Sequence, residues 1–139
     1  MKLTQVKGNT WVMEGNQLIP IYILPGGGHC VLIDTGLRKE REEIEQTLLE
    51  AGLVPDAVIC SHAHVDHCAN NEYFQKKYHI PVALSAPEAG MASSILNLKC
   101  YRLLVSPDTA AEEMQDMVHT PDIMIPYVDW KLALGGVEF

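Results

Sequence analysis

Apolar residues in the first third of the chain follow the pattern of β-strands. Residues 11–14 and 17–24 are rich in apolar and β-branched side chains, and residues 29–33 form a further apolar run. A Pro-Gly-Gly-Gly segment at residues 25–28 separates the last two runs and has the composition of a turn. The pattern predicts a β-hairpin whose second strand ends just before Asp34.

The pattern then changes to that of an amphipathic helix. Between residues 38 and 51, Ile44 and Leu48 lie on one face, whereas acidic and basic residues occupy the opposite face. The short, wholly apolar run at residues 57–60 is typical of a strand that is buried on both faces after a crossover helix. We therefore predict a βαβ unit over residues 29–60.

The rest of the chain alternates between helical and extended patterns, without a repeat or a linker. Because 139 residues suffice for one core and not for two, we expect a single domain over residues 1–139. The expected elements are a helix at residues 71–78, a strand at 81–85, a helix that begins near Ala86, a helix at 109–118, an extended segment at 119–126 and a weak strand at 128–134.

Composition and charge narrow the range of partners. Hydrophobic residues make up 47% of the chain and charged residues 20%, which is typical of a globular protein. The formal net charge is -8, and no cluster of Lys and Arg is present to neutralise phosphates, so a nucleic-acid partner is not expected. No stretch has the pattern of a signal peptide or of a membrane span. We therefore expect no membrane association and a cytoplasmic location.

The four cysteines are dispersed and form no CxxC pair. In a reducing compartment such residues are expected to be free and mostly buried thiols. Cys68 directly follows His67, so a thiolate there could reach a metal, but a small apolar filler remains the favoured interpretation.

The segment His-Ala-His-Val-Asp-His at residues 62–67 carries the candidate chemistry. It directly follows the predicted buried strand, and ligand sites of α/β sheets lie at the carboxyl ends of such strands. Three imidazoles and one carboxylate are donors that zinc and its first-row neighbours accept. His62 and His64 can point to the same side of an extended backbone, whereas Asp66 and His67 follow after a bend, so the two pairs can serve different metals. Two cations roughly 3.5 to 4 Å apart can hold a bridging hydroxide as nucleophile.

These residues resemble the HxHxDH signature of the metallo-β-lactamase superfamily. The surrounding sequence is similar too, because a hairpin leads to an Asp-Thr-Gly turn at residues 34–36, then to a helix and to an apolar strand that ends at the signature. The resemblance implies the αββα sandwich of that family, an α+β fold, of which this chain would supply only the first αβ half. A chance run of polar loop residues is the alternative, and the fixed order of the segment disfavours it.

The resemblance also implies roles for individual residues. His62 and His64 would bind the first metal, and Asp66 and His67 the second, while Asp66 would act catalytically by orienting or deprotonating the attacking water. Asp34 would hydrogen-bond the ligands rather than the metals; judged without the resemblance, it is a turn former. The metals would be two divalent ions, with zinc expected and iron or manganese as alternatives. The expected reaction is hydrolysis of a small-molecule carbonyl compound such as a thioester, lactone or lactam.

The sequence also departs from the family pattern. The downstream histidine, bridging aspartate and last histidine of the family site have no counterpart in residues 1–139. His119, followed by Thr and Pro, superficially imitates the first of these, but we interpret it as a surface or loop histidine. The signature is followed by Cys-Ala-Asn-Asn at residues 68–71 where the family usually has glycines. Each half-site therefore has two protein ligands, and partial metal occupancy or none is expected.

A second class of function follows from these departures. The chain would then be a truncated, non-catalytic fragment that binds metal or dimerises. A sheet with one uncovered apolar face usually recruits a partner, so a homodimer through that face is expected.

Overall fold

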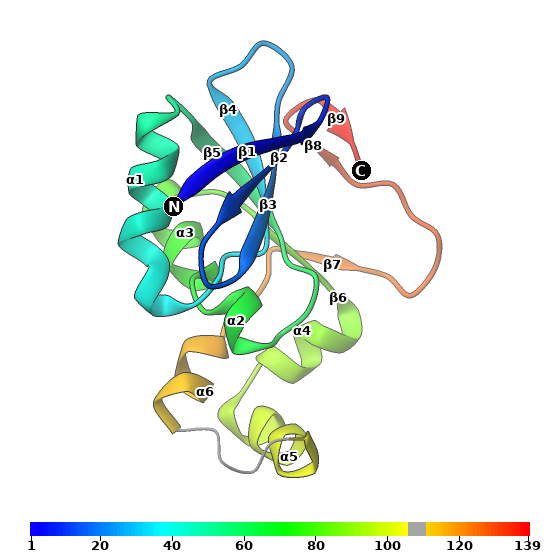
Figure 1. Cartoon of the computed structure of the whole chain (residues 1–139). Coiled ribbons are helices and arrows are strands. Elements are labelled where there is room, and N and C mark those ends of the chain that lie inside the picture. The colour runs from blue at the N-terminus through cyan, green and yellow to red at the C-terminus, as the bar shows by residue number, and fades with distance from the viewer. Residues whose placement is uncertain (106–110) are drawn as a thin grey trace.

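A mixed β-sheet forms the centre of the molecule (Figure 1). The computed structural model describes residues 1–105 and 111–139, and of the side chains it describes those outside residues 101–113. Neighbouring strands from β1 to β4 are antiparallel, and those from β4 to β7 are parallel. Within the described residues the seven strands lie in sequence order: β1 (Lys2–Lys7), β2 (Thr10–Glu14), β3 (Leu18–Ile23), β4 (His29–Ile33), β5 (Val54–Ile59), β6 (Val82–Ser85) and β7 (Ile123–Ile125).

The predicted hairpin and βαβ unit are both confirmed. β3 pairs with β4 in antiparallel register, with Ile21 opposite Leu32. The chain then passes through a short 3₁₀ turn and α1 (Arg41–Glu50) before β5 pairs with β4 in parallel, with Leu32 opposite Val58. The sequence pattern did not predict β1, because four of its six positions are polar and it is an edge strand that pairs only with β2.

The helices lie mainly beside and below the sheet. The predicted helix at residues 71–78 is confirmed as α3 (Asn71–Tyr78), and the one near Ala86 as α4 (Ala86–Ala92). Part of the helix expected at residues 109–118 is seen as α6 (Ala111–Met117), and residues 109 and 110 lie outside the described residues. The remaining helices are α2 (Val65–Cys68) and α5 (Ile95–Val105). Among the residues described, no helix combines the length and the apolar character needed to cross a bilayer.

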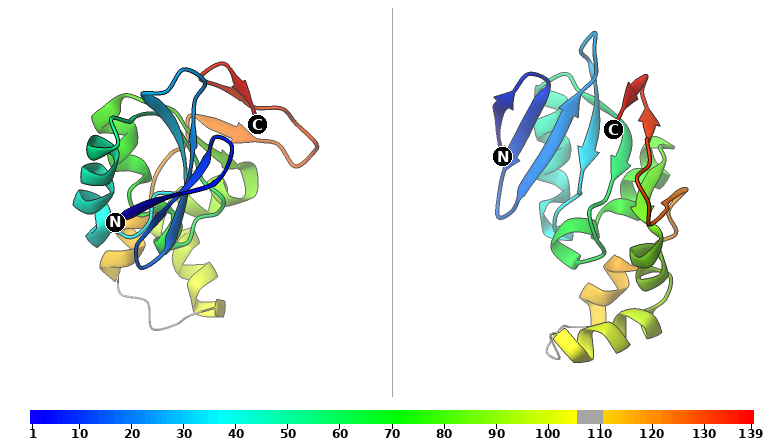
Figure 2. Two further views of the ribbon diagram at one scale, coloured as in Figure 1. Left: turned by 45° about the horizontal axis from the view of Figure 1, so that its top comes forward. Right: turned by 90° about the vertical axis from the view of Figure 1, so that its right-hand side faces the viewer.

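The two faces of the sheet are covered differently. α1 and α3 lie on one face, where Ile44, Leu48 and Phe74 pack on the sheet and are almost completely buried. A short hairpin of β8 (Ala133–Leu134) and β9 (Val137–Glu138) lies on the opposite side, as the left view of Figure 2 shows. The sheet with helices on one face corresponds to the single αβ half that the sequence predicted.

Candidate metal centre

The candidate site lies where the parallel strands β4 and β5 end side by side. Because their carboxyl ends meet at one edge of the sheet, Asp34 after β4 comes next to Ser61 after β5. The sharp turn after β4 needs glycine at Gly36, whose φ is +66° and where a Cβ would lie 2.7 Å from Ile19 Cδ1. The turn then contacts the segment 62–67, because the Thr35 N–H donates to the carbonyl of His67 at 2.7 Å.

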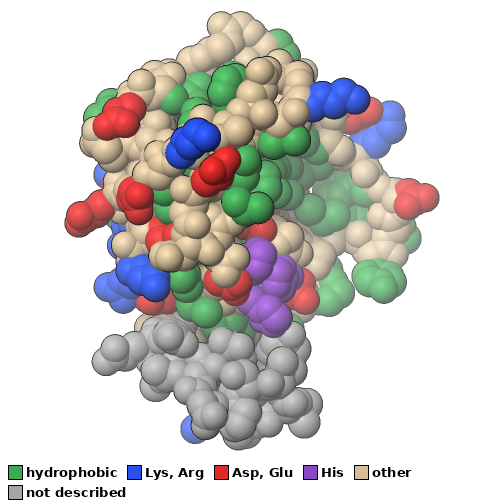
Figure 3. All heavy atoms as spheres, in the orientation of Figure 1, with side chains coloured by type: hydrophobic (Ala, Val, Ile, Leu, Met, Phe, Trp, Pro, Cys, Tyr) green, Lys and Arg blue, Asp and Glu red, His purple; other side chains and the backbone are tan. Residues whose placement is uncertain are grey.

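The structure brings the four predicted ligands into one cluster at the surface, where imidazoles gather in Figure 3. The His62 Nε2 and His64 Nδ1 atoms are 3.0 Å apart. The His67 Nε2 and Asp66 Oδ2 atoms are 3.4 Å apart. The two pairs are adjacent, since the rings of His62 and His67 have centroids 4.1 Å apart.

Asp34 connects the two pairs from behind. Its Oδ1 accepts a hydrogen bond from the Ser61 N–H at 2.7 Å, and its Oδ2 lies 2.8 Å from both Ser61 Oγ and His67 Nδ1. The residue is buried and has a φ of +67°, a left-handed conformation that aspartate tolerates better than most residues. Asp34 therefore lies where a residue that orients the ligands is expected.

These hydrogen bonds determine which imidazole nitrogens carry protons. A carboxylate only accepts, so the Ser61 hydroxyl donates to Asp34 and accepts from His62 Nδ1, 2.9 Å away. In the same way, the Nδ1–H of His67 donates to Asp34. Both rings direct Nε2 at the other donors of the cluster, and a neutral imidazole with its proton on Nδ1 binds a metal through Nε2.

The donor set fits divalent metals in chemistry and spacing. Two ligands of a tetrahedral zinc ion, each about 2.0–2.1 Å from it, are about 3.3 Å apart, and both donor pairs are close to this separation. Each pair supplies two donors, and in the described part of the chain no group of three or more His, Cys, Asp or Glu side chains is arranged to hold one ion. The residues fit metal binding as two incomplete half-sites.

Two residues that the sequence analysis missed hold the segment in place. Ser61 links Asp34 to His62, as described above. Glu88 of α4 accepts a hydrogen bond from the Ala63 N–H at 2.8 Å and fixes the backbone between His62 and His64. A hydroxyl directly before the first histidine was the available signal for Ser61, whereas Glu88 is 25 positions away and had none.

His119 lies in the loop after α6, which was one of the two predicted alternatives, but the other alternative, a surface position, is wrong. Only 3% of His119 is exposed. The residue follows α6, and its side chain contacts Asn71 at the start of α3. Its Nδ1 donates to the Met117 carbonyl at 2.9 Å, and its Nε2 accepts from the amide of Asn71 at 3.1 Å. The Asn71 oxygen in turn accepts from the Thr35 hydroxyl at 2.8 Å. Burial lowers the pKa of His119, so it is held neutral.

The cysteines near the site behave as the favoured interpretation predicted. Cys30, Cys60 and Cys68 are buried and free, and Cys100 is exposed. Burial raises the pKa of Cys60 to about 12 and that of Cys68 well above its usual value. Cys68 therefore packs as a small apolar residue in a buried cluster.

The family model described as Metallo-beta-lactamase superfamily matches residues 8–130. The chain belongs to the metallo-β-lactamase superfamily. The probable metallo-hydrolase YqgX of Bacillus subtilis (strain 168) is 35% identical over 77 residues, which are 55% of this chain and 36% of that protein. The family membership that the sequence resemblance implied is thus confirmed.

Solved metallo-β-lactamase structures confirm the fold. The FEZ-1 metallo-β-lactamase of Legionella gormanii matches with a TM-score of 0.77 at 17% identity, over 99% of this chain and 51% of that one. A β-lactamase from Chitinophaga pinensis matches with a TM-score of 0.77 at 15% identity, over 99% of this chain and 50% of that one. This chain spans about half the length of these two structures, which is consistent with one αβ half.

Proposed function

We propose that this chain carries the leading half of the metal site of a metal-dependent hydrolase. Membership of the metallo-β-lactamase superfamily supports this class of activity. The observation that carries the proposal is the arrangement of two donor pairs, each at the spacing of adjacent metal ligands, around one buried carboxylate that orients both.

In this proposal, His62 and His64 bind one metal through Nε2 and Nδ1, and Asp66 and His67 bind the second. Asp34 holds His67 directly and His62 through Ser61, so that the imidazoles keep their orientation and tautomer when the metals are absent. Partners of this kind are typically worth 10- to 100-fold in metal affinity. Zinc suits the donor set best, with iron and manganese as the alternatives.

Two divalent ions at such a site supply Lewis acidity and lower the pKa of a water molecule. Asp66 is the only one of the four proposed ligands with an ionisable oxygen, and its side chain remains about one-third exposed. It can therefore accept a hydrogen bond from water and orient it, which is the catalytic role that we assign to it. The proposed substrate is a small molecule with a hydrolysable carbonyl group, such as a thioester, a lactone or a lactam. The cytoplasmic location stays a prediction.

Metal analysis tests the proposal most directly. The chain is purified, freed of metal by dialysis and titrated with zinc, iron(II) and manganese(II), alongside His62→Ala and the distant control His29→Ala. We expect zinc binding in the parent and in the control, with a loss in His62→Ala. Absence of binding in the parent would contradict the proposal for this polypeptide, and hydrolysis of a generic thioester or lactone by the zinc-loaded parent is the test of the activity.

The second candidate, a non-catalytic dimer, is favoured by the apolar face opposite α1 and α3. Leu24, Val31 and Ala83 form a buried cluster there with the β8–β9 hairpin, and Ile123 and Ile125 remain only partly buried. Beside this face, Tyr127 is 90% exposed. We propose that a second copy of the chain covers this face. Light scattering coupled to gel filtration is expected to give twice the mass of one chain, and a clean monomer would contradict the dimer without affecting the metal site.

A further inference from the structure

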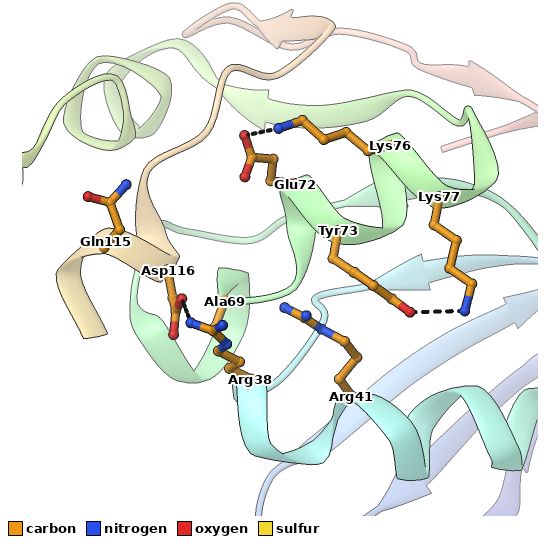
Figure 4. Close-up of a pocket in the computed structure, with 9 residues that line it drawn as sticks. All are labelled: Arg38, Arg41, Ala69, Glu72, Tyr73, Lys76, Lys77, Gln115 and Asp116. Carbon is orange, nitrogen blue, oxygen red and sulfur yellow. Dashed lines mark hydrogen bonds and ion pairs between the residues drawn. The ribbon is translucent and has the colours of Figure 1, made fainter. Parts of the chain in front are cut away.

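A basic pocket lies on the helical side of the molecule, apart from the candidate metal centre. It has a volume of about 510 Å³ and is formed by the 3₁₀ turn and the start of α1, by one side of α3 along most of its length, and by α6 (Figure 4). No residue of the segment 62–67 lines it. The lining comprises Arg38, Arg41, Ala69, Glu72, Tyr73, Lys76, Lys77, Gln115 and Asp116.

The charge of this pocket is opposite to that of the chain. Four cations and two carboxylates line it, which makes a formal charge of +2, whereas the whole chain has a net charge of -8. Concentrating basic groups in one hollow of an acidic protein favours the binding of an anion there. The volume is in the range of small-molecule sites.

Arg41 is the residue that makes the pocket specific. Its Nε donates to Asn70 Oδ1 at 2.9 Å, and its guanidinium lies over the ring of Tyr73, 4.0 Å from the ring centroid. These two contacts fix the plane of the guanidinium and use one of its five N–H groups. Among the residues that the structure describes, Arg41 has no carboxylate partner, so its remaining donors face the pocket in a fixed orientation.

The other cations of the pocket are already paired to different degrees. Arg38 binds Asp116 at 2.8 Å, and Lys76 binds Glu72 at 2.6 Å in an exposed pair. Lys77 binds Glu45 and the Tyr73 hydroxyl. Exposed pairs of this type are weak, so Arg38 and Lys76 can turn to a stronger anion, whereas Lys77 is tied to two groups.

We propose that this pocket binds the phosphate group of a small molecule, with the guanidinium of Arg41 as its fixed anchor and Arg38 and Lys76 as mobile partners. A rigid, planar fork of donors matches two oxygens of a phosphate, and ammonium groups add charge without demanding geometry. Asn70, which holds Arg41, also donates to the carbonyls of Thr35 and Leu37. Asn70 therefore connects the proposed site to the turn that supports the metal centre.

Calorimetric titration of the metal-free chain with phenyl phosphate, inorganic phosphate and acetate tests the proposal. We expect saturable binding of one phenyl phosphate per chain, and weaker binding of acetate. A preference for inorganic phosphate over phenyl phosphate would identify the free ion rather than a phosphomonoester as the ligand. Arg41→Gln is expected to lower the affinity about tenfold or more, as the loss of a charge-assisted hydrogen-bonding anchor predicts.

Matched variants separate this site from other sources of binding. Lys131→Gln removes the same charge far from the pocket, where Lys131 pairs with Glu138, and is expected to leave the affinity within about twofold. His62→Ala should also leave it unchanged. Lys76→Gln, an exposed change that does not threaten folding, is expected to weaken binding by about two- to threefold. Absence of saturable binding, equal losses in Arg41→Gln and Lys131→Gln, an unchanged affinity in Lys76→Gln, or loss of binding in His62→Ala would each overturn the proposal.

Discussion

On the outer side of the turn at residues 34–36, the imidazoles of the metal-site segment form a partly exposed cluster, whereas on its inner side Thr35, Asn71 and His119 are buried. The side chain of His67 is 30% exposed, but only 3% of His119 is. Both groups depend on the same turn, through Asp34 on the outer side and Thr35 on the inner side. Both groups contain histidine, in opposite environments.

The difference teaches how a histidine becomes a candidate ligand or a structural residue. On the outer side, His62 and His67 use Nδ1 to hydrogen-bond the supporting residues and direct Nε2 at other metal donors. On the inner side, both nitrogens of His119 have structural partners within the protein. The role of each histidine therefore depends on the partner of its second ring nitrogen, and tertiary contacts determine that partner.

The largest effect is expected on the inner side, from Asn71→Ala. This change removes the acceptor of Thr35 and the donor to His119 at a fully buried position. Leaving buried polar groups without partners should lower the free energy of unfolding by about 2–4 kcal/mol. Urea unfolding of the metal-free chain measures this. The matched control is Asn97→Ala, which removes an exposed amide that also makes two hydrogen bonds and is expected to cost less than about 1 kcal/mol. Equal losses of unfolding free energy in the two variants would show that the buried hydrogen bonds of Asn71 matter no more for stability than those of an exposed amide.

On the outer side, Asp34→Asn is expected to lower zinc affinity by about 10- to 100-fold. Asparagine keeps the size and tolerates the left-handed backbone, but it loses the charge that accepts from Ser61 and His67. Competition with a chromogenic chelator measures the affinity. Asp56→Asn, at the distant pair with His29, is the control that should bind zinc as the parent does. If the two variants bind zinc with equal affinity, Asp34 acts only as a turn former, which is the interpretation that its sequence context alone supports.

The smallest effect is a pH dependence that belongs to His119. Because its pKa is lowered in the folded state, the unfolded chain binds more protons just below the usual histidine pKa of about 6.5. The contribution of His119 to stability is therefore complete above about pH 6.5 and is lost as the pH falls below this value and through the lowered pKa of the folded state. The slope cannot exceed about 1.4 kcal/mol per pH unit. Unfolding free energies of the metal-free parent and of His119→Gln between pH 5 and 8 are compared, and parallel curves would show that His119 is not held neutral by burial.

Sequence reasoning worked best where the determining residues are near one another in the chain. The helices α1 and α3 were predicted because their apolar faces recur within a few residues, and β4 and β5 because each contains a short continuous apolar run. β1 was missed because an edge strand whose positions are mostly polar carries little signal. The candidate ligands were found because all four lie within residues 62–67.

The sequence by itself determined the family, the βαβ unit and the set of candidate ligands, since periodicity and contiguous motifs are local properties. Only the tertiary structure decided that Asp34 supports both donor pairs, that His119 is buried behind the turn, and that Arg38 and Arg41 meet α3 and α6 in a basic pocket. The Asp34–His67 contact spans 33 positions and the Asn71–His119 contact 48. Contacts of this range exist only once the strands have paired and the helices have packed, because nothing in the local pattern of either residue specifies its distant partner.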